Sequence, residues 1–341
     1  MKEAKNNTIH DVARVAKVSI KTVSRILNND PRVREANVVK VKKAITELNY
    51  KMDFNARRLR TKQSYLIAVL YLDYRGNFYS NMVIGGAISA CDELGYDVLI
   101  RPIKYSGENL MSSVMHMIER SNPDGFILPS PLCENQLLLD LLNKKNIPLV
   151  RISPCDINGN DLVYCDEVSA TQKAIQHLIS LGHTDIGFIN YLVGHAAGNW
   201  RYEGYKKALA EADIKEKPEL VEQHEYQANI VEHAARRLLK LPNPPTAIFT
   251  TNDASASIVY RVASQLNKKI PYDLSVMGFD DDPVVEYLWP PLSTVRQPVT
   301  ELGCEAAKLL IRKFIQKENV TEIVNPKCEL LIRNSCGPLI S

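Results

Sequence analysis

Apolar residues near the start of the chain recur at spacings of three and four, in three runs that each span only a few turns. The runs are Ile9, Val12, Ala13 and Ala16; then Val23, Ile26 and Leu27; and then Val38, Val41, Ala44, Ile45 and Leu48. This periodicity predicts three amphipathic helices, the third from about residue 34 to residue 48. Because helices this short are unstable alone in water, we expect them to share one small core.

Polar residues mark where the first two helices begin. Thr8 can cap the first helix, with Asp11 reaching back toward it as in a capping box. The segment AKVS then turns the chain, and Ser19 can cap the second helix. The pattern therefore predicts two helices joined by a tight turn and closed by a third.

From Tyr65 onward, short apolar runs alternate with amphipathic stretches. The predicted strands cover residues 65–72, 96–103, 125–130, 148–153, 185–191, 220–226, 247–252 and 274–279, and the predicted helices include 78–94, 170–181 and 201–212. Alternation of this kind is typical of parallel α/β sheets. We expect a boundary between two such units near residues 163–167, where a helix begins after an extended segment.

The chain has 341 residues, more than one ordinary core accommodates, so we expect two or three domains. No apolar run approaches the ~20 residues that span a bilayer, and the N-terminus lacks a signal-peptide apolar region. We therefore expect a cytoplasmic protein with no membrane partner. The seven cysteines form no C-x-x-C pair, so we expect reduced thiols, no metal site and no cofactor.

Charge is distributed unevenly along the chain. Residues 1–63 hold 16 lysines and arginines against six acidic residues, whereas the remainder holds 26 against 33. A basic segment attached to an acidic body suggests that the segment meets a polyanion and the body does not. A charged face that is merely solvated is the alternative, and charge alone does not decide between them.

The second predicted helix turns a polar, basic face outward. Ile20, Lys21, Thr22 and Arg25 follow the capping Ser19, in the half of a helix-turn-helix that enters the major groove. Arg25 can bind guanine through two hydrogen bonds, whereas Lys21 suits a phosphate. A three-helix module that binds protein is the alternative.

Residues 51–63 are polar and basic, and they join the three predicted N-terminal helices to the predicted α/β units. Propensity allows a turn or two of helix from Asn55 to Arg60, too little for stability in water. Without DNA, we expect this stretch to behave as a flexible linker.

Polar and aromatic residues follow several of the predicted strands. They are Asp73, Phe78, Tyr226, Asn252, Asp253 and Asp280 to Asp282, with Arg201 at the start of a helix. Because ligands of open parallel sheets gather at the carboxyl ends of the strands, these residues are candidates for binding a polyhydroxylated molecule such as a sugar. Each has a structural alternative: Asp280 can cap a helix, Arg201 can pair with a surface acid, and Tyr226 can simply pack.

The stretch TIHDVARVAKVSIKTVSRILNNDPRV resembles the DNA-binding head of the LacI/GalR repressors, whose pattern is I-x-D-V-A-x-x-A-G-V-S-x-x-T-V-S-R-x-L-N. The likeness continues in LISLGHTDIGFI, RYEGY, PTAIFTTND and SVMGFDDDPVVEYLWPPLSTVRQP, and covers nearly the whole chain. Lys17 departs from it, because the family usually has glycine in this turn. A left-handed residue there costs roughly 1 kcal/mol for a side chain other than glycine.

The resemblance implies an α/β protein: an N-terminal three-helix helix-turn-helix head plus a hinge helix, then a two-lobed periplasmic-binding-protein-like body of parallel α/β sheets. It implies these boundaries: 1–50 for the head, 51–63 for the hinge, 64–164 and 296–325 for the first lobe, and 165–295 and 326–341 for the second. By the same resemblance, a hinge helix containing Ala56, Arg57 and Leu59 forms on DNA, and Leu59 enters the minor groove.

For the body, the resemblance implies that Arg201 and Asp280 hold an effector, and that Asn252 does so in some relatives. The family's N-P-F motif is GNFY here, without proline, which weakens the case for effector contacts by Phe78 and Tyr79. Two heads on a homodimer would bind a palindromic operator of about 16–20 base pairs, with each recognition helix in a major groove one turn apart.

Three functional classes can be compared. An effector-controlled homodimeric repressor of carbohydrate-utilisation genes accounts for both the head and the body. A sugar-binding receptor without a DNA role accounts for the body but not for the basic head. An enzyme lacks support, because the chain contains no G-x-S-x-G, G-x-x-x-x-G-K-[ST], H-E-x-x-H or G-x-G-x-x-G motif.

Overall fold

The computed structural model describes residues 7–27, 32–50, 63–72, 78–103, 110–191, 196–224, 228–319 and 325–339. The chain divides into two compact units, Met1–Gln63 and Ser64–Ser341, which we call the head and the body. Each unit has its own hydrophobic core.

The head consists of α1 (Ile9–Ala16), α2 (Ile20–Leu27) and α3 (Glu35–Glu47). Its core is formed by the apolar side chains of all three helices: Val12, Ala13, Ala16, Val23, Ile26, Val41 and Ala44 are buried, with Ile9, Leu27, Val38, Ile45 and Leu48 packed around them. The three predicted helices and their shared core are therefore confirmed.

The predicted caps of the first two helices are also confirmed. The Asp11 carboxylate accepts hydrogen bonds from the backbone and the hydroxyl of Thr8, which together with Arg14 lower the pKa of Asp11 to about 2. The Ser19 hydroxyl accepts the Thr22 N–H at 3.1 Å. Lys17 ends α1 in the left-handed conformation, at φ 54° and ψ 45°. A lysine therefore occupies a backbone position that favours glycine.

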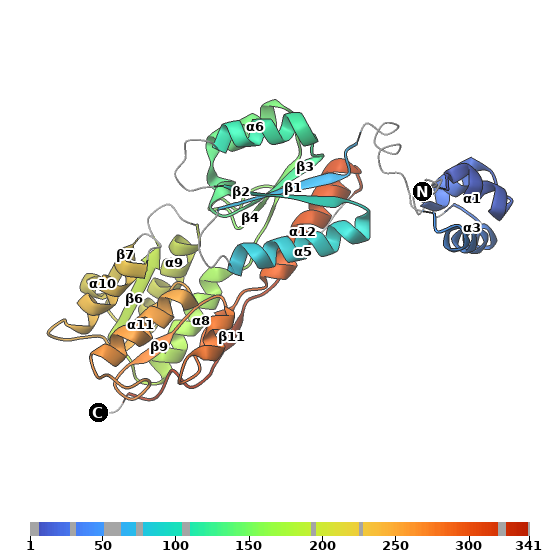
Figure 1. Ribbon diagram of the computed structural model, residues 1–341. Coiled ribbons are helices and arrows are strands. Elements are labelled where there is room, and N and C mark those ends of the chain that lie inside the picture. Colours follow the sequence, from blue (N-terminus) through green and yellow to red (C-terminus); the bar gives the residue numbers. More distant parts are fainter. Residues whose placement is uncertain are drawn as a thin grey trace, which may run out of the picture. The chain divides into compact units, whose positions relative to one another are not determined.

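The first lobe of the body is a parallel sheet covered on both faces (Figure 1). Its strands lie in the order β2-β1-β3-β4-β5: β1 (Leu66–Leu72), β2 (Asp97–Ile103), β3 (Gly125–Pro129), β4 (Leu149–Ile152) and β5 (Leu162–Val163). Its helices are α5 (Phe78–Leu94), α6 (Leu110–Ser121), η1 (Leu132–Glu134) and α7 (Gln136–Lys144). Every neighbouring pair of strands is parallel, as the alternating pattern predicted.

The second lobe repeats this plan with four parallel strands in the order β7-β6-β8-β9. The strands are β6 (Ile186–Tyr191), β7 (Val221–His224), β8 (Ala247–Thr250) and β9 (Ser275–Met277). Its helices are α8 (Glu167–Ser180), α9 (Ala196–Glu211), η2 (Pro218–Leu220), α10 (Ala228–Leu239), α11 (Asp253–Gln265) and η3 (Pro283–Tyr287). An antiparallel pair, β10 (Thr294–Arg296) with β11 (Glu329–Leu331), lies beside this lobe and bridges to its strand-end segments.

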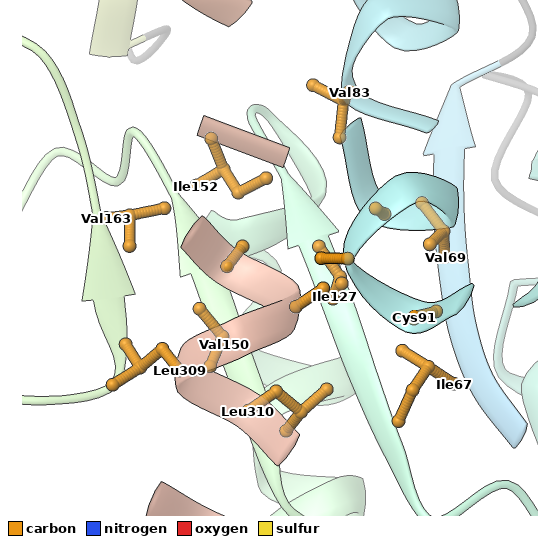
Figure 2. Close-up of a cluster of buried hydrophobic side chains, with 14 of the residues drawn as sticks. Ile67, Val69, Val83, Cys91, Ile127, Val150, Ile152, Val163, Leu309 and Leu310 are labelled. Atoms are coloured by element: carbon orange, nitrogen blue, oxygen red, sulfur yellow. The ribbon is translucent and has the colours of Figure 1, made fainter. Parts of the chain in front are cut away.

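Alternate residues of the first-lobe strands enter two separate cores. Ile67 and Val69 pack on one face with α5, while Ala68 and Leu70 pack on the other with α6 and α7. Figure 2 shows the first of these cores, where Leu309 and Leu310 lie against the strands. Because both faces are buried, the strands appear in the sequence as continuous apolar runs.

The chain returns to the first lobe after completing the second-lobe sheet. Helix α12 (Val299–Leu309) and the π-helical turn Leu310–Ile315 that continues it pack against α5 and β3. A side-chain Cβ at Gly303 would lie 2.1 Å from the carbonyl oxygen of Val83, so α5 and α12 approach closely only because this residue is glycine. Residues of the last third of the sequence thereby complete the first-lobe core.

Two helices begin earlier than the sequence predicted. α8 starts at Glu167 rather than at residue 170, because the Asp166 carboxylate caps it by accepting the Ser169 N–H. α9 starts at Ala196 rather than at residue 201. Both extensions place the residues considered below inside the first turns of helices.

No helix in the described part of the chain is long and apolar enough to cross a membrane. Over the same residues, no group of three or more histidine, cysteine or acidic side chains is placed to hold a metal ion. The seven cysteines are all free thiols.

Candidate functional site

The outward face of α2 carries the residues predicted to contact DNA. Ser19, Ile20, Lys21 and Arg25 are exposed, whereas Val23 and Ile26 of the same helix lie in the head core. Thr22 is half-buried, and its hydroxyl hydrogen bonds with that of Ser19 at 2.9 Å. The structure therefore brings all five candidates together along α2 and the residue before it, but Arg25 lies in the last turn rather than in the predicted N-terminal half, because α2 has only eight residues.

Three other candidates, Ala56, Arg57 and Leu59 of the predicted hinge, lie outside the described residues, as does Tyr226 of the body. Asp73 also falls in an undescribed range.

Arg201 is buried near the N-terminus of α9, with 3% of its surface exposed. Its Nε donates to Oε2 of Glu167 at 2.8 Å, and Nη1 donates to the carbonyl oxygen of Thr251. The guanidinium also stacks on the ring of Phe279, 3.8 Å from its centroid. Arg201 thus pairs with a buried acid rather than with a surface one.

Asp280 lies beside this arginine, just beyond β9. Its Oδ1 is 3.7 Å from Nη2 of Arg201 and accepts a hydrogen bond from Nε2 of Gln297 at 2.6 Å. Burial raises the pKa of Asp280 to about 7, although Arg201 and Gln297 act in the opposite direction. Its backbone has φ 112°, a region that favours glycine and that in other residues often marks a functional site. The cap of the following helix is Asp282, so Asp280 does not serve as that cap.

The remaining described candidates have different surroundings. Asn252 is buried and caps α11, because its Oδ1 accepts the Ser255 N–H at 2.7 Å. Phe78 begins α5 and is half-buried. The structure therefore brings Arg201 and Asp280 into contact, gives Asn252 a capping role at the next strand end, and places Phe78 on the first lobe.

Sequence reasoning missed two residues of this region, Glu167 and Ser153. Glu167 is 2% exposed and opens α8 directly after the first crossover between lobes. Tyr79 of α5 in the first lobe is close enough to Glu167 for this carboxylate to raise its pKa, in addition to the larger effect of burial. Ser153 directly follows β4, and within the described residues its hydroxyl and that of Tyr79 are both buried without a hydrogen-bond partner. The rule that ligands gather at strand ends would have found Ser153, had it been applied to every strand.

Besides Ser153, two other hydroxyls at strand ends have no hydrogen-bond partner in the described part of the chain. Ser130 follows β3 of the first lobe and Thr251 follows β8 of the second. Within the described residues, both Oγ atoms are buried without any hydrogen bond. A buried polar atom without a partner costs about 1–3 kcal/mol, so such atoms point to a ligand or water that completes them.

Asp253, at the start of α11, forms hydrogen bonds that hold the segments beyond the second-lobe strands. Its Oδ1 accepts the Thr294 hydroxyl at 2.7 Å and its Oδ2 accepts the Asp282 N–H at 2.8 Å. A Cβ at Gly278 would lie 2.0 Å from Oδ1, so the glycine is needed for this close approach. Burial, followed by the nearby Asp280, raises the pKa of Asp253. The fully buried Asp253 therefore fixes the loop that carries Asp280.

Comparison with known proteins agrees with both halves of this description. Residues 8–53 match the model of bacterial regulatory proteins of the lacI family, and residues 175–336 match a periplasmic binding protein-like domain. The ribose operon repressor of Escherichia coli (strain K12) is 33% identical over 315 residues, which cover 91% of this chain and 93% of that protein.

Solved structures give the same result over the whole chain. A complex of the transcriptional regulator CelR with cellobiose has a TM-score of 0.72 at 26% identity and covers 97% of this chain and 100% of its own. The lac repressor dimer bound to operator and the anti-inducer ONPF has a TM-score of 0.74 at 25% identity, covering 98% and 100%. The predicted fold class is therefore confirmed, and the chain belongs to the LacI family of bacterial regulatory proteins, a family of DNA-binding transcription regulators.

Proposed function

We propose that this protein is a homodimeric repressor of carbohydrate-utilisation genes, controlled by a sugar-like effector that binds between the two lobes of the body. The relatives support each part: one is a ribose operon repressor, one holds cellobiose, and one is a dimer on operator DNA. Two observations on this chain carry the proposal, namely the exposed basic face of α2 and the partnerless hydroxyls at the strand ends.

The DNA contacts follow from the geometry of α2. Lys21 lies exposed in its first turn, beside Ile20 and the hydrogen-bonded pair of Ser19 and Thr22, and Arg25 lies exposed in its last turn. In a helix-turn-helix the second helix enters the major groove, where arginine can bind guanine bidentately, while a lysine can hold a phosphate beside the groove. We assign base contact to Arg25 and backbone contact to Lys21.

We further propose that residues 51–63 become a hinge helix on operator DNA. In this proposal Leu59 wedges into the minor groove, with Ala56 and Arg57 beside it. The segment is too short to be helical in water, so its ordering would couple the body to DNA binding.

The effector site we propose combines Arg201 and Asp280 with Asn252, and with Phe78 and Tyr226 as aromatic walls. Asp280 can accept hydrogen bonds from sugar hydroxyls, and the arginine guanidinium offers a planar set of N–H donors. The carboxyl ends of both sheets contribute to this site, as expected for open parallel sheets. Ser130 and Thr251 would gain hydrogen-bond partners from the bound sugar.

We divide the chain for this function into a head of residues 1–50, a hinge of 51–63, a first lobe of 64–164 and 296–325, and a second lobe of 165–295 and 326–341. Packing of α12 and its π-helical extension on the first-lobe core supports the return of the chain to that lobe. Effector-dependent lobe movement would then alter the spacing of the two hinges in the dimer.

The protein in this proposal acts on DNA in the cytoplasm and catalyses no reaction. A soluble sugar receptor without a DNA role is the alternative function. The basic head argues against it, because a receptor has no use for a helix-turn-helix unit.

Two measurements on the full chain test the proposal. Selection from random duplex DNA should enrich a palindrome of about 16–20 base pairs. A thermal-shift screen of saccharides and sugar phosphates should find a ligand that raises the melting temperature, because a ligand that binds only the folded state stabilises it. Failure to enrich any sequence would favour the receptor, whereas the absence of any stabilising saccharide would remove the sugar effector.

A further inference from the structure

The buried ionisable groups beside the strand ends include more acids than bases. Of the lysines and arginines in the described parts of the chain, Arg201 alone is buried. Buried carboxyl groups are present at both Glu167 and Asp253, and Asp280 adds a third that is one-fifth exposed. The cluster therefore contains more carboxyl groups than cations.

Glu167 already neutralises the charge of Arg201. Its Oε2 accepts from Nε of Arg201 at 2.8 Å, and both side chains are at most 4% exposed. Hydrogen bonds between opposite charges are about twice as strong as neutral ones, and a buried pair resists separation because each ion would be left uncompensated. An acidic ligand would have to compete with Glu167 for the charge of Arg201.

An anionic ligand would also meet repulsion from Asp280. Its Oδ1 lies 3.7 Å from Nη2 of Arg201, just beyond the end of β9. Burying a further carboxylate or phosphate beside Glu167 and Asp280 carries a desolvation cost without a free opposite charge to offset it. Sugar hydroxyls avoid this cost, since each can donate to a carboxylate and accept from a hydroxyl such as that of Ser130 or Thr251.

We propose, resting on the sugar-effector function above, that the effector is an uncharged polyhydroxylated molecule and that Glu167 is the residue that excludes acidic and phosphorylated analogues. Glu167 acts by holding the charge of Arg201 in an internal pair. Glu167 thus determines specificity, because it offsets the positive charge that would otherwise attract an anionic ligand.

The test compares ligands that differ in one charged group. Calorimetric titration of the full-length protein would use neutral monosaccharides and disaccharides from the thermal-shift screen, together with the uronate and terminal phosphate derived from each. We expect a neutral sugar to bind and its charged derivatives to bind at least about tenfold more weakly, a difference of about 1.4 kcal/mol.

Glu167→Gln removes the internal counter-charge while keeping the shape of the side chain. We expect the preference for the neutral sugar over its uronate to shrink at least about tenfold. Glu167→Asp should retain the preference, because it keeps the charge. Asp161→Asn is the matched control: it removes the carboxylate from the Arg151 ion pair of β4, at 3.1 Å, and should leave the preference unchanged.

The outcomes separate this inference from the function on which it rests. Tight binding of a uronate or sugar phosphate, with weaker binding of the neutral parent, overturns the inference and leaves a carbohydrate effector in place. If no saccharide of any charge binds, the effector class and the inference both fail. The wild-type titration needs no variant, so the inference can be refuted even if Glu167→Gln does not fold.

Discussion

The head and the body arrange their functional residues in opposite ways. In the head, Lys21 and Arg25 lie exposed on α2, and the side chains that hold the helix in place are on its other face. In the body, Arg201 is buried and bonded to Glu167 and to the backbone of Thr251. The proposed DNA-binding residues can therefore be changed without disturbing their fold, whereas the proposed effector-binding residues also hold their fold together.

This difference fits the two kinds of ligand. DNA is a large polyanion that stays hydrated and is met by an exposed, charged surface. A small sugar is bound by being buried, and the polar groups that meet it must be oriented before it arrives. A substitution should consequently affect binding alone in the head, and both binding and stability in the body.

Removing the head should have the largest effect. A fragment comprising residues 64–341 should lose sequence-specific DNA binding entirely, while it stays folded and retains effector affinity, because the two units have separate cores. Electrophoretic mobility shift and calorimetric titration measure the two properties. Retention of sequence-specific binding by the fragment would show that the head is not the DNA reader.

Arg201→Ala should impair both effector binding and stability. Removing one partner of a buried ion pair costs about 3–5 kcal/mol, because Glu167 would remain buried without its counter-charge. Effector affinity should fall at least about tenfold as well. Chemical denaturation of the effector-free protein and titration of the folded fraction separate the two losses. Unchanged stability would show that the pair contributes little to the fold.

Arg25→Ala should affect binding alone. If Arg25 contacts a base, operator affinity should fall by about 1–3 kcal/mol, with little loss on random DNA and no change in melting temperature. Lys21→Ala is the matched comparison, because a phosphate contact weakens binding to all sequences about equally. An equal loss on operator and random DNA for Arg25→Ala would make it a phosphate contact too.

The raised pKa of Asp280 predicts a pH dependence in the body that the head should lack. Sugar hydroxyls donate to the ionised carboxylate, so effector affinity should fall by up to about tenfold for each pH unit below 7 and level off above it. Since the folded pKa of about 7 exceeds the ordinary 3.8, the effector-free body should lose stability as pH rises between these values. Asp280→Asn should remove both dependences; a pH profile that persists in this variant would assign it to another group.

The smallest effect concerns the turn of the head. Lys17→Gly should stabilise the head by about 1 kcal/mol, because Lys17 has a left-handed backbone conformation. Operator affinity should not change, since the substitution leaves α2 intact. Thermal unfolding of a head fragment of residues 1–63 tests this, and a loss of stability would mean that the lysine side chain contributes more than its backbone costs.

Most of the fold could be predicted from local patterns in the sequence. The caps at Thr8 and Ser19 involve residues only three positions apart, so the sequence alone could predict them. The strands of the body were recognisable because both faces are buried, which makes them continuous apolar runs. Arg201 and Asp280 were found because strand ends in parallel sheets are a general location for ligands.

The rest depends on contacts between distant parts of the chain. Glu167 and Arg201 are brought together by the packing of α8 against α9, which no local pattern encodes. Whether the hydroxyls of Ser130 and Thr251 have partners depends on the complete tertiary surroundings. The roles of Leu59 and Tyr226 stay predictions, because both lie outside the described residues.

The central claim is that effector binding in the body changes DNA binding by the head. Its most direct test is the dissociation constant of full-length protein for the selected operator, measured with and without a saturating stabilising saccharide. Coupling of about 1–3 kcal/mol predicts a change of roughly 5-fold to 150-fold, and operator must change saccharide affinity by the same factor. A saccharide that binds the body while leaving the operator dissociation constant unchanged would contradict the claim.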